Sequence, residues 1–255
     1  MQAAALPLIS GWNWVKDGWL LFKRQPLAFT SLALFISLMV VLATQTSPVG
    51  PIAFVILMPA MTFMIMSGCR QAAANKRILP MDWFQAFKQP MILKKMIGLG
   101  TLYLALCLLS ALVSFIPFMN DLSDAIQAIN ASGDFEPLIQ SAQIPLIFFL
   151  SFYALVTMLF WYAPMLVAWH SIPLTRALFY SLVACWRNKL SMLIYGLVWV
   201  VAFLSIDLAV SLLAWLGLPS ALTVNLQFLI NIIAASVMYC SFYPNYVSVF
   251  EASET

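Results

Sequence analysis

Long apolar runs without charge dominate the chain and predict membrane-spanning helices. From Gln25 to Cys69 no residue is charged, and the turn-forming residues 46–51 divide this run into two. A helix needs about 20 apolar residues to cross the hydrocarbon of a bilayer. The pattern predicts six spans, at about 27–45, 52–69, 96–119, 145–169, 190–216 and 225–248.

The composition agrees with a membrane-embedded chain. Of the 255 residues 64% are apolar and only 8% are charged, whereas about a quarter of an ordinary soluble protein is charged. So few charges cannot cover a water-exposed surface, but a surface facing hydrocarbon does not need them. We therefore predict an all-α, polytopic membrane protein with a single transmembrane domain over residues 1–255.

The charges fall on opposite sides of the predicted spans. The side before spans one, three and five carries all twelve basic residues: Lys16, Lys23, Arg24, Arg70, Lys76, Arg77, Lys88, Lys94, Lys95, Arg176, Arg187 and Lys189. The loop between spans three and four carries Asp121, Asp124, Asp134 and Glu136. The positive-inside rule makes the basic side cytoplasmic. We expect both termini there, and residues 1–10 lack the features of a cleavable signal.

Similar segments precede the first, third and fifth spans. Each is aromatic and ends in basic residues: Trp19–Pro26, Trp83–Pro90 and Tyr180–Lys189. The even spans each contain a proline, at Pro59, Pro164 and Pro244, which is expected to kink the helix. We predict three parallel units, at about 10–75, 80–171 and 172–250, each an amphipathic interfacial helix followed by a hairpin. The alternative is that aromatic and basic flanks are common to all membrane interfaces.

The first of these segments shows the expected amphipathic pattern. Trp12, Val15, Trp19 and Phe22 fall on one helical face, and Lys16 and Lys23 on the other. Such helices lie among the lipid headgroups with their aromatic side towards the hydrocarbon. The loop 120–143 is predicted to contain a further short helix, with an apolar face of Leu122, Ile126 and Ile129.

Three stretches of sequence resemble a family of uncharacterised proteobacterial inner-membrane proteins. They are Gly11-Trp12-x-Trp14-x3-Gly18-Trp19-x2-Phe22-x3-Pro26, then Ala163–Ala168, then Arg176–Ser181 followed by Arg187-Asn188. More remotely, the last stretch is similar to YciC-like proteins and to the membrane domain of some glycerophosphodiester phosphodiesterases. The resemblance implies a multi-pass protein of the bacterial inner membrane. It assigns no reaction and no catalytic residue.

Two sets of polar residues are candidates for function. Asp207 lies inside the fifth span, and Asn225, Gln227 and Asn231 begin the sixth, so the four could form one polar cluster. The alternative is ordinary hydrogen bonding between helices, worth about 0.6 kcal/mol per contact. The second set is basic: Arg176, Arg187, Lys23 and Arg24 are candidates for binding a lipid headgroup or a phosphate, unless they serve only as topology signals.

The remaining residues suggest no reaction. The four cysteines form no CxxC pair and lie far from His170, the one histidine, so neither a metal site nor a disulfide framework is predicted. His170 is expected at the cytoplasmic boundary. We expect a non-enzymatic protein without a cofactor that organises lipid or binds a partner complex or a second copy, and no nucleic acid. The alternative is a small-solute transporter or channel that uses the Asp207 region.

Overall fold

The computed structural model describes residues 3–84 and 89–251. Within these ranges every secondary-structure element is a helix, joined by turns and loops. Six helical segments are long and apolar enough to cross a membrane, which confirms the predicted all-α polytopic class. They are formed by α2 (Pro26–Gln45), α3 (Val49–Ala73), α5 (Pro90–Phe115), α7 (Glu136–Phe160), α10 (Lys189–Trp215) and α11 (Ser220–Phe250). The spans are therefore where the apolar runs predicted them.

The second hairpin differs from the prediction in detail. After α5, a 3-10 turn (Ile116–Phe118) leads into α6 (Met119–Ser132), the short helix expected in the loop. The fourth span begins at Glu136, nine residues before the predicted start, because Pro137 lies in the first turn, where its missing N–H costs no hydrogen bond. This span also ends early, at Phe160, and the chain resumes as α8 (Ala163–His170).

A serine hydroxyl fills the break between α7 and α8. Pro164 cannot donate a backbone hydrogen bond and obstructs the preceding turn. The hydroxyl of Ser181 donates to the carbonyl of Met158 at 2.7 Å and accepts the N–H of Tyr162 at 2.9 Å. These two backbone groups would bond each other in an unbroken helix. By contrast, α3 and α11 continue through Pro59 and Pro244.

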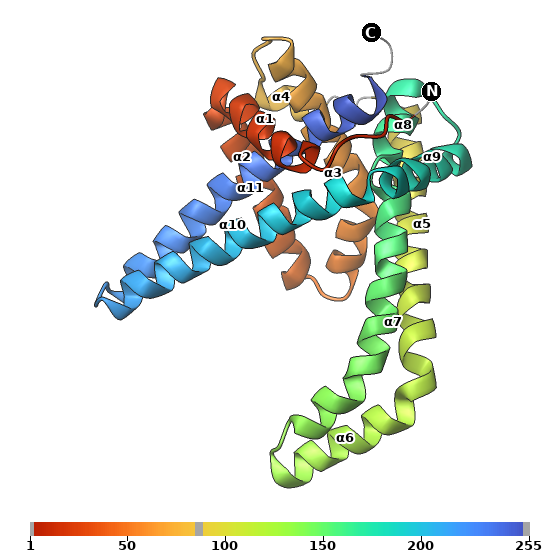
Figure 1. The fold of residues 1–255 in the computed structure, drawn as a ribbon, viewed down its shortest axis with the longest axis vertical. Coiled ribbons are helices and arrows are strands. Elements are labelled where there is room, and N and C mark those ends of the chain that lie inside the picture. Colours follow the sequence, from red (N-terminus) through yellow and green to blue (C-terminus); the bar gives the residue numbers. More distant parts are fainter. Residues whose placement is uncertain (1–2, 85–88, 252–255) are drawn as a thin grey trace.

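All three hairpins turn at the same end of the molecule (Figure 1). At the opposite end lie the short helices α1 (Ser10–Arg24), α4 (Pro80–Trp83), α8 and α9 (Leu174–Arg187). Each segment that leads into a hairpin packs on the hairpin before it: α4 on α3, and α9 on α7 and α8. The first helix, α1, leads into the first hairpin and packs on the last one, against α10 and α11. The sequence repeat itself stays a prediction, and residues 85–88 of its second segment lie outside the described residues.

Close packing places α1 differently from the prediction. A Cβ on Gly11 would lie 2.3 Å from the carbonyl oxygen of Ser191, and one on Gly18 would lie 2.6 Å from the Cα of Ser241. The glycine face therefore meets α10 and α11, and it carries the buried side chains Trp14, Leu21 and Phe22. The predicted aromatic face was wrong in part, because Phe22 is buried, whereas Trp12 and Trp19 are exposed beside the lysines.

The N-terminal segment before α1 is held by two residues at the start of α10. The buried amide of Asn188 accepts the N–H of Leu6 at 2.8 Å and donates to the carbonyl of Ala4 at 2.8 Å. The hydroxyl of Ser191 donates to the carbonyl of Pro7 at 2.9 Å. On the other side, Ala4 donates its N–H to the carbonyl of Val249 at 2.9 Å. These bonds fix the chain from Ala4 to Pro7 across the same two helices that α1 covers.

Candidate functional site

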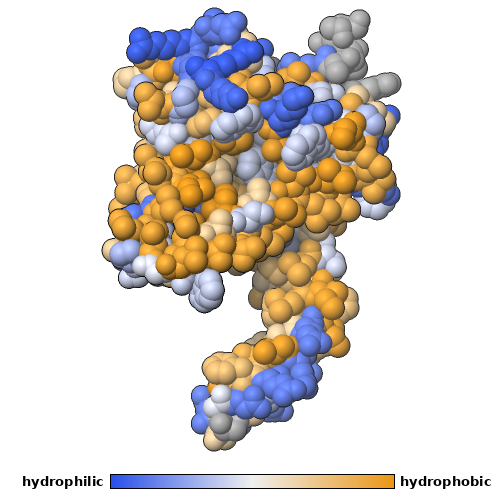
Figure 2. All heavy atoms as spheres, turned by 60° about the vertical axis from the view of Figure 1, so that its left-hand side comes forward, coloured by the Kyte–Doolittle hydropathy of each residue, from blue (hydrophilic) through white to orange (hydrophobic). Residues whose placement is uncertain are grey.

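The basic residues gather at one end of the molecule. Figure 2 shows hydrophilic residues at the end that carries the short lead helices, an apolar middle, and a second hydrophilic region on the protrusion formed by α6. Every basic residue within the described ranges lies on α1, on α9, or on a helix end or loop of that first side. The four acidic residues of the loop region lie in or beside α6. This separation matches the charge pattern expected of a protein that spans a membrane once per helix.

Helix α9 carries the two arginines predicted to bind a headgroup. Its inner face consists of small residues, Ala177, Ser181, Ala184 and Cys185, which are buried against α7 and α8. Arg176 and Arg187 are exposed, and within the described part of the chain neither guanidinium has a hydrogen-bond or ion-pair partner. Eleven residues of helix separate them, about 16 Å at the usual rise, and both lie on one side.

Two aromatic side chains stand next to these arginines. Phe179 and Trp186 are 60% and 61% exposed, seven residues apart on α9, and so they lie on one helical face beside the arginine face. The ammonium of Lys189 lies 4.5 Å from the centre of the Trp186 ring. We name Arg176, Phe179, Trp186 and Arg187 the α9 band. Exposed aromatics beside unpaired cations are the arrangement of a helix at a membrane surface.

The other two predicted basic residues make contacts within the protein. The guanidinium of Arg24 donates to the carbonyls of Ala72 and Ala73 at 3.2 and 3.1 Å and to the side-chain oxygen of Asn75 at 3.0 Å. It therefore neutralises the partial negative charge at the C-terminal end of α3, and headgroup binding by Arg24 stays a prediction. Lys23 is exposed, with its ammonium 5.1 Å from the centre of the Trp19 ring.

The structure brings together two of the four residues predicted as an intramembrane polar cluster. The amide of Gln227 on α11 donates to the carboxylate of Asp207 on α10. Asn225 donates to the carbonyl of Ala221 on its own helix at 2.8 Å, because two residues of helix turn it away from the face of Gln227. The side-chain oxygen of Asn231, one turn further along, is buried without a partner among the described residues. The structure therefore shows one contact within the predicted cluster, between Asp207 and Gln227, and a role for the four residues stays a prediction.

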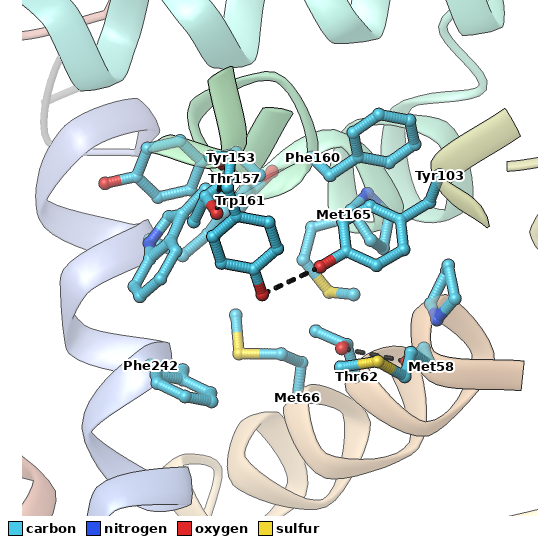
Figure 3. Close-up of a pocket in the computed structure, with 14 residues that line it drawn as sticks. Met58, Thr62, Met66, Tyr103, Tyr153, Thr157, Phe160, Trp161, Met165 and Phe242 are labelled. Carbon is cyan, nitrogen blue, oxygen red and sulfur yellow. Dashed lines mark hydrogen bonds between the residues drawn. The ribbon is translucent and has the colours of Figure 1, made fainter. Parts of the chain in front are cut away.

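A pocket of about 270 Å³, which we did not predict from the sequence, lies between the three hairpins. Its walls come from α3, α5, α7, α8 and α11, and most of the side chains are aromatic rings or methionines (Figure 3). The phenol oxygens of Tyr103 on α5 and Tyr153 on α7 form a hydrogen bond of 3.2 Å across it. Pro59 and Pro164 both line the pocket, so the mid-span prolines were the signal in the sequence that pointed to this region.

Buried polar residues join the helices above this pocket. The hydroxyl of Tyr162 donates to the side-chain oxygen of Asn245 at 2.5 Å, and the hydroxyls of Tyr195 and Ser241 are 2.6 Å apart. His170 is exposed, as expected of a boundary residue, and its Nε2 lies 2.8 Å from the hydroxyl of Tyr246. These bonds connect α8, α10 and α11, and they position side chains without forming an obvious reactive pair.

The cysteines are placed for packing. Cys69, Cys185 and Cys240 are buried, and the described residues contain no group of three metal-binding side chains. Burial on the inner face of α9 raises the pKa of the Cys185 thiol to about 12, although an interaction with the Ser181 hydroxyl opposes the shift. A thiol with such a pKa stays protonated at neutral pH, so it is a poor nucleophile and a poor metal ligand.

One known protein matches the sequence along its whole length. The chain is 30% identical over 258 residues to a probable inner membrane protein of Burkholderia thailandensis, and the alignment covers 100% of this chain and 96% of that relative. No family model matches the sequence. No solved structure matches it either. Six apolar helices and a full-length relative of this kind make the protein a multi-pass protein of the inner membrane. The chain belongs to the same family of inner membrane proteins as the Burkholderia thailandensis protein.

Proposed function

We propose that this protein is a non-enzymatic membrane protein that binds anionic lipid headgroups at its basic end, with that end and both termini in the cytoplasm. The observation that carries the proposal is the α9 band, in which two exposed, unpaired arginines flank exposed aromatic rings. Anionic lipids of the cytoplasmic leaflet attract such cations by about 1 kcal/mol for each Lys or Arg near the surface.

The packing of α9 on α7 and α8 holds the α9 band in a fixed position. Its inner face is held by the Ser181 hydroxyl, which fills the break between α7 and α8. The outer face is thereby oriented by the transmembrane helices and does not depend on lipid for its position.

The transport alternative rests on weaker geometry. Asp207 is exposed and Gln227 is half-buried, and this pair lies on the outer part of the two-helix hairpin α10–α11. A shallow groove of about 250 Å³ passes Gln227, lined only by residues of α10 and α11. A solute path through the membrane would need walls from further helices, so headgroup binding is the better supported function.

The test is retention of anionic lipid by a double charge reversal. We expect the wild-type protein, purified in mild detergent, to retain phosphatidylglycerol or cardiolipin in native mass spectrometry. The variant Arg176→Glu/Arg187→Glu should bind at least about 30-fold more weakly, since each lost attraction is worth about 1 kcal/mol or more. The matched control is Lys76→Glu/Arg77→Glu, which makes the same charge change on an exposed loop at the same end. Equal lipid retention by both double variants would refute the role of the α9 band.

A further inference from the structure

The pocket between the hairpins lies within the membrane-spanning part of the protein and has exposed residues on its rim. Tyr103 is the fourteenth residue of α5, about 20 Å along that helix, so the pocket lies at the depth of the hydrocarbon. Met58 and Tyr153 on its rim are 40% and 39% exposed. The hairpin α10–α11 diverges from α5–α7 (Figure 1).

The lining suits a hydrocarbon chain. Among the residues that the structure describes, no acidic or basic side chain lines the pocket. The hydroxyls of Thr62 and Thr157 donate to carbonyls of their own helices, at 3.0 and 2.9 Å, and the two phenols bond to each other. These four hydroxyls therefore already have partners, and an apolar occupant leaves none of the four unsatisfied. Methionine side chains adapt their shape to a flexible occupant.

The size limits what can enter. Pockets for small molecules usually measure about 300–1,000 Å³, so a volume of about 270 Å³ is too small for a complete phospholipid. It can hold a stretch of one acyl chain while the headgroup and second chain stay in the bilayer. We propose that this pocket binds one acyl chain of a membrane phospholipid, which enters sideways between α7 and the α10–α11 hairpin. This inference is independent of headgroup binding by the α9 band.

The experiment uses a phosphatidylcholine carrying a photoreactive diazirine in the middle of one acyl chain. The full-length protein is reconstituted into vesicles containing this lipid, irradiated, and digested, and the labelled residues are located by mass spectrometry. We expect adducts on Met66, which is 3% exposed and lies deep in the pocket, as well as on lipid-facing residues of α7. Thr157→Phe should fill the pocket and abolish the deep adducts.

The matched control is Ser151→Phe, since Ser151 is exposed on the same helix and likewise bonds its own helix backbone, at 2.8 Å. That variant should keep the deep adducts, and so should Arg176→Glu/Arg187→Glu. If Thr157→Phe does not fold, the presence or absence of Met66 adducts in the wild-type protein decides the question. Adducts confined to exposed positions would overturn the proposal. So would deep labelling by a diazirine fatty acid but not by the phospholipid, or protein–protein crosslinks through the pocket in place of lipid adducts.

Discussion

At the basic end, the spans are joined by α1, α8 and α9 into one packed body, whereas at the acidic end the hairpins separate from one another (Figure 1). The packed end contains buried polar side chains with hydrogen-bond partners, including Asn188, Ser181, Ser241 and Asn245. At the other end, α10 has an apolar stretch of which only 11% is buried. Protein contacts therefore stabilise one half of the molecule, and lipid contacts must cover the other.

The difference follows from how helices associate in a membrane. Lipid tails are as apolar as leucine, so leucine-rich helix surfaces gain little by meeting each other. Close backbone contacts through small residues and hydrogen bonds supply the association energy. Three glycines in close contact with another helix, Gly11, Gly18 and Gly100, meet α10, α11 and α3 respectively. We expect perturbations at the packed end to have large effects and those at the acidic end to have small ones.

The largest effect is expected from Gly18→Leu. A Cβ at this position would lie 2.6 Å from both the Cα and the Cβ of Ser241, so α1 could not stay against α11. We expect a loss of about 3 kcal/mol or more in the free energy of unfolding. This corresponds to a fall in Tm of about 6–12 °C, measured by circular dichroism in detergent.

Gly196→Ala is the matched control, because a Cβ on this glycine of α10 would meet nothing within 4 Å. Its Tm should stay at the wild-type value or rise slightly, since alanine favours a helix over glycine. A Gly18→Leu protein as stable as Gly196→Ala would show that α1 is not clamped to α10 and α11.

An intermediate effect is expected from Asn188→Ala. The change leaves the N–H of Leu6 and the carbonyl of Ala4 without their partner, next to the buried start of α10. A fully buried unsatisfied group costs about 1–3 kcal/mol, and since Leu6 and Ala4 are only half-buried, we expect a total loss of about 1–2 kcal/mol. Hydrogen exchange of the Leu6 amide should become much faster, and proteases should cut within residues 3–9. The control, Asn225→Ala, removes an exposed amide bonded to its own helix and should leave that exchange unchanged. Unaltered protection of Leu6 in Asn188→Ala would contradict the structure.

The smallest effect is expected at the acidic end, from the pair Asp207 and Gln227. A double-mutant cycle with Asp207→Ala and Gln227→Ala should give a coupling energy of about 0.6 kcal/mol, the average for such contacts in a membrane. Steric trapping in bicelles measures the unfolding free energies required. A coupling well above about 1.7 kcal/mol, the upper range for such bonds, would show that this end holds a specialised polar site and would revive the transport alternative.

The sequence was sufficient for the spans because the thickness of the hydrocarbon dictates their length. It was insufficient for the face of α1, because the partners of Gly11 and Gly18 are Ser191 and Ser241, which lie far away in the chain. A helical wheel shows Trp12 and Trp19 as the apolar face, and only the tertiary contact shows that the glycine face is buried. The same limit explains why the sequence did not predict the partner of Arg24 at the end of α3.

The candidate sites were predictable to different degrees. Arg176 and Arg187 follow from helical spacing alone, since eleven residues return to nearly the same face. The pairing of Asp207 with Gln227 requires the register of α10 against α11, which the turn at Gly217 fixes in space. The pocket is lined by side chains of five helices, so no local sequence pattern predicts it. Pro59 and Pro164, which line two of its walls, are visible in the sequence as prolines inside apolar spans.

The contact of α1 with the last hairpin has a consequence for biogenesis. Trp14 donates to the hydroxyl of Ser248 at 2.7 Å, and 234 residues of chain separate them. At a synthesis rate of about 5–20 residues per second, the partner of α1 emerges on the order of 10 to 50 seconds later. Until then its glycine face is uncovered, so the helix must wait at the membrane surface. The first helix to be made is among the last to reach its final place.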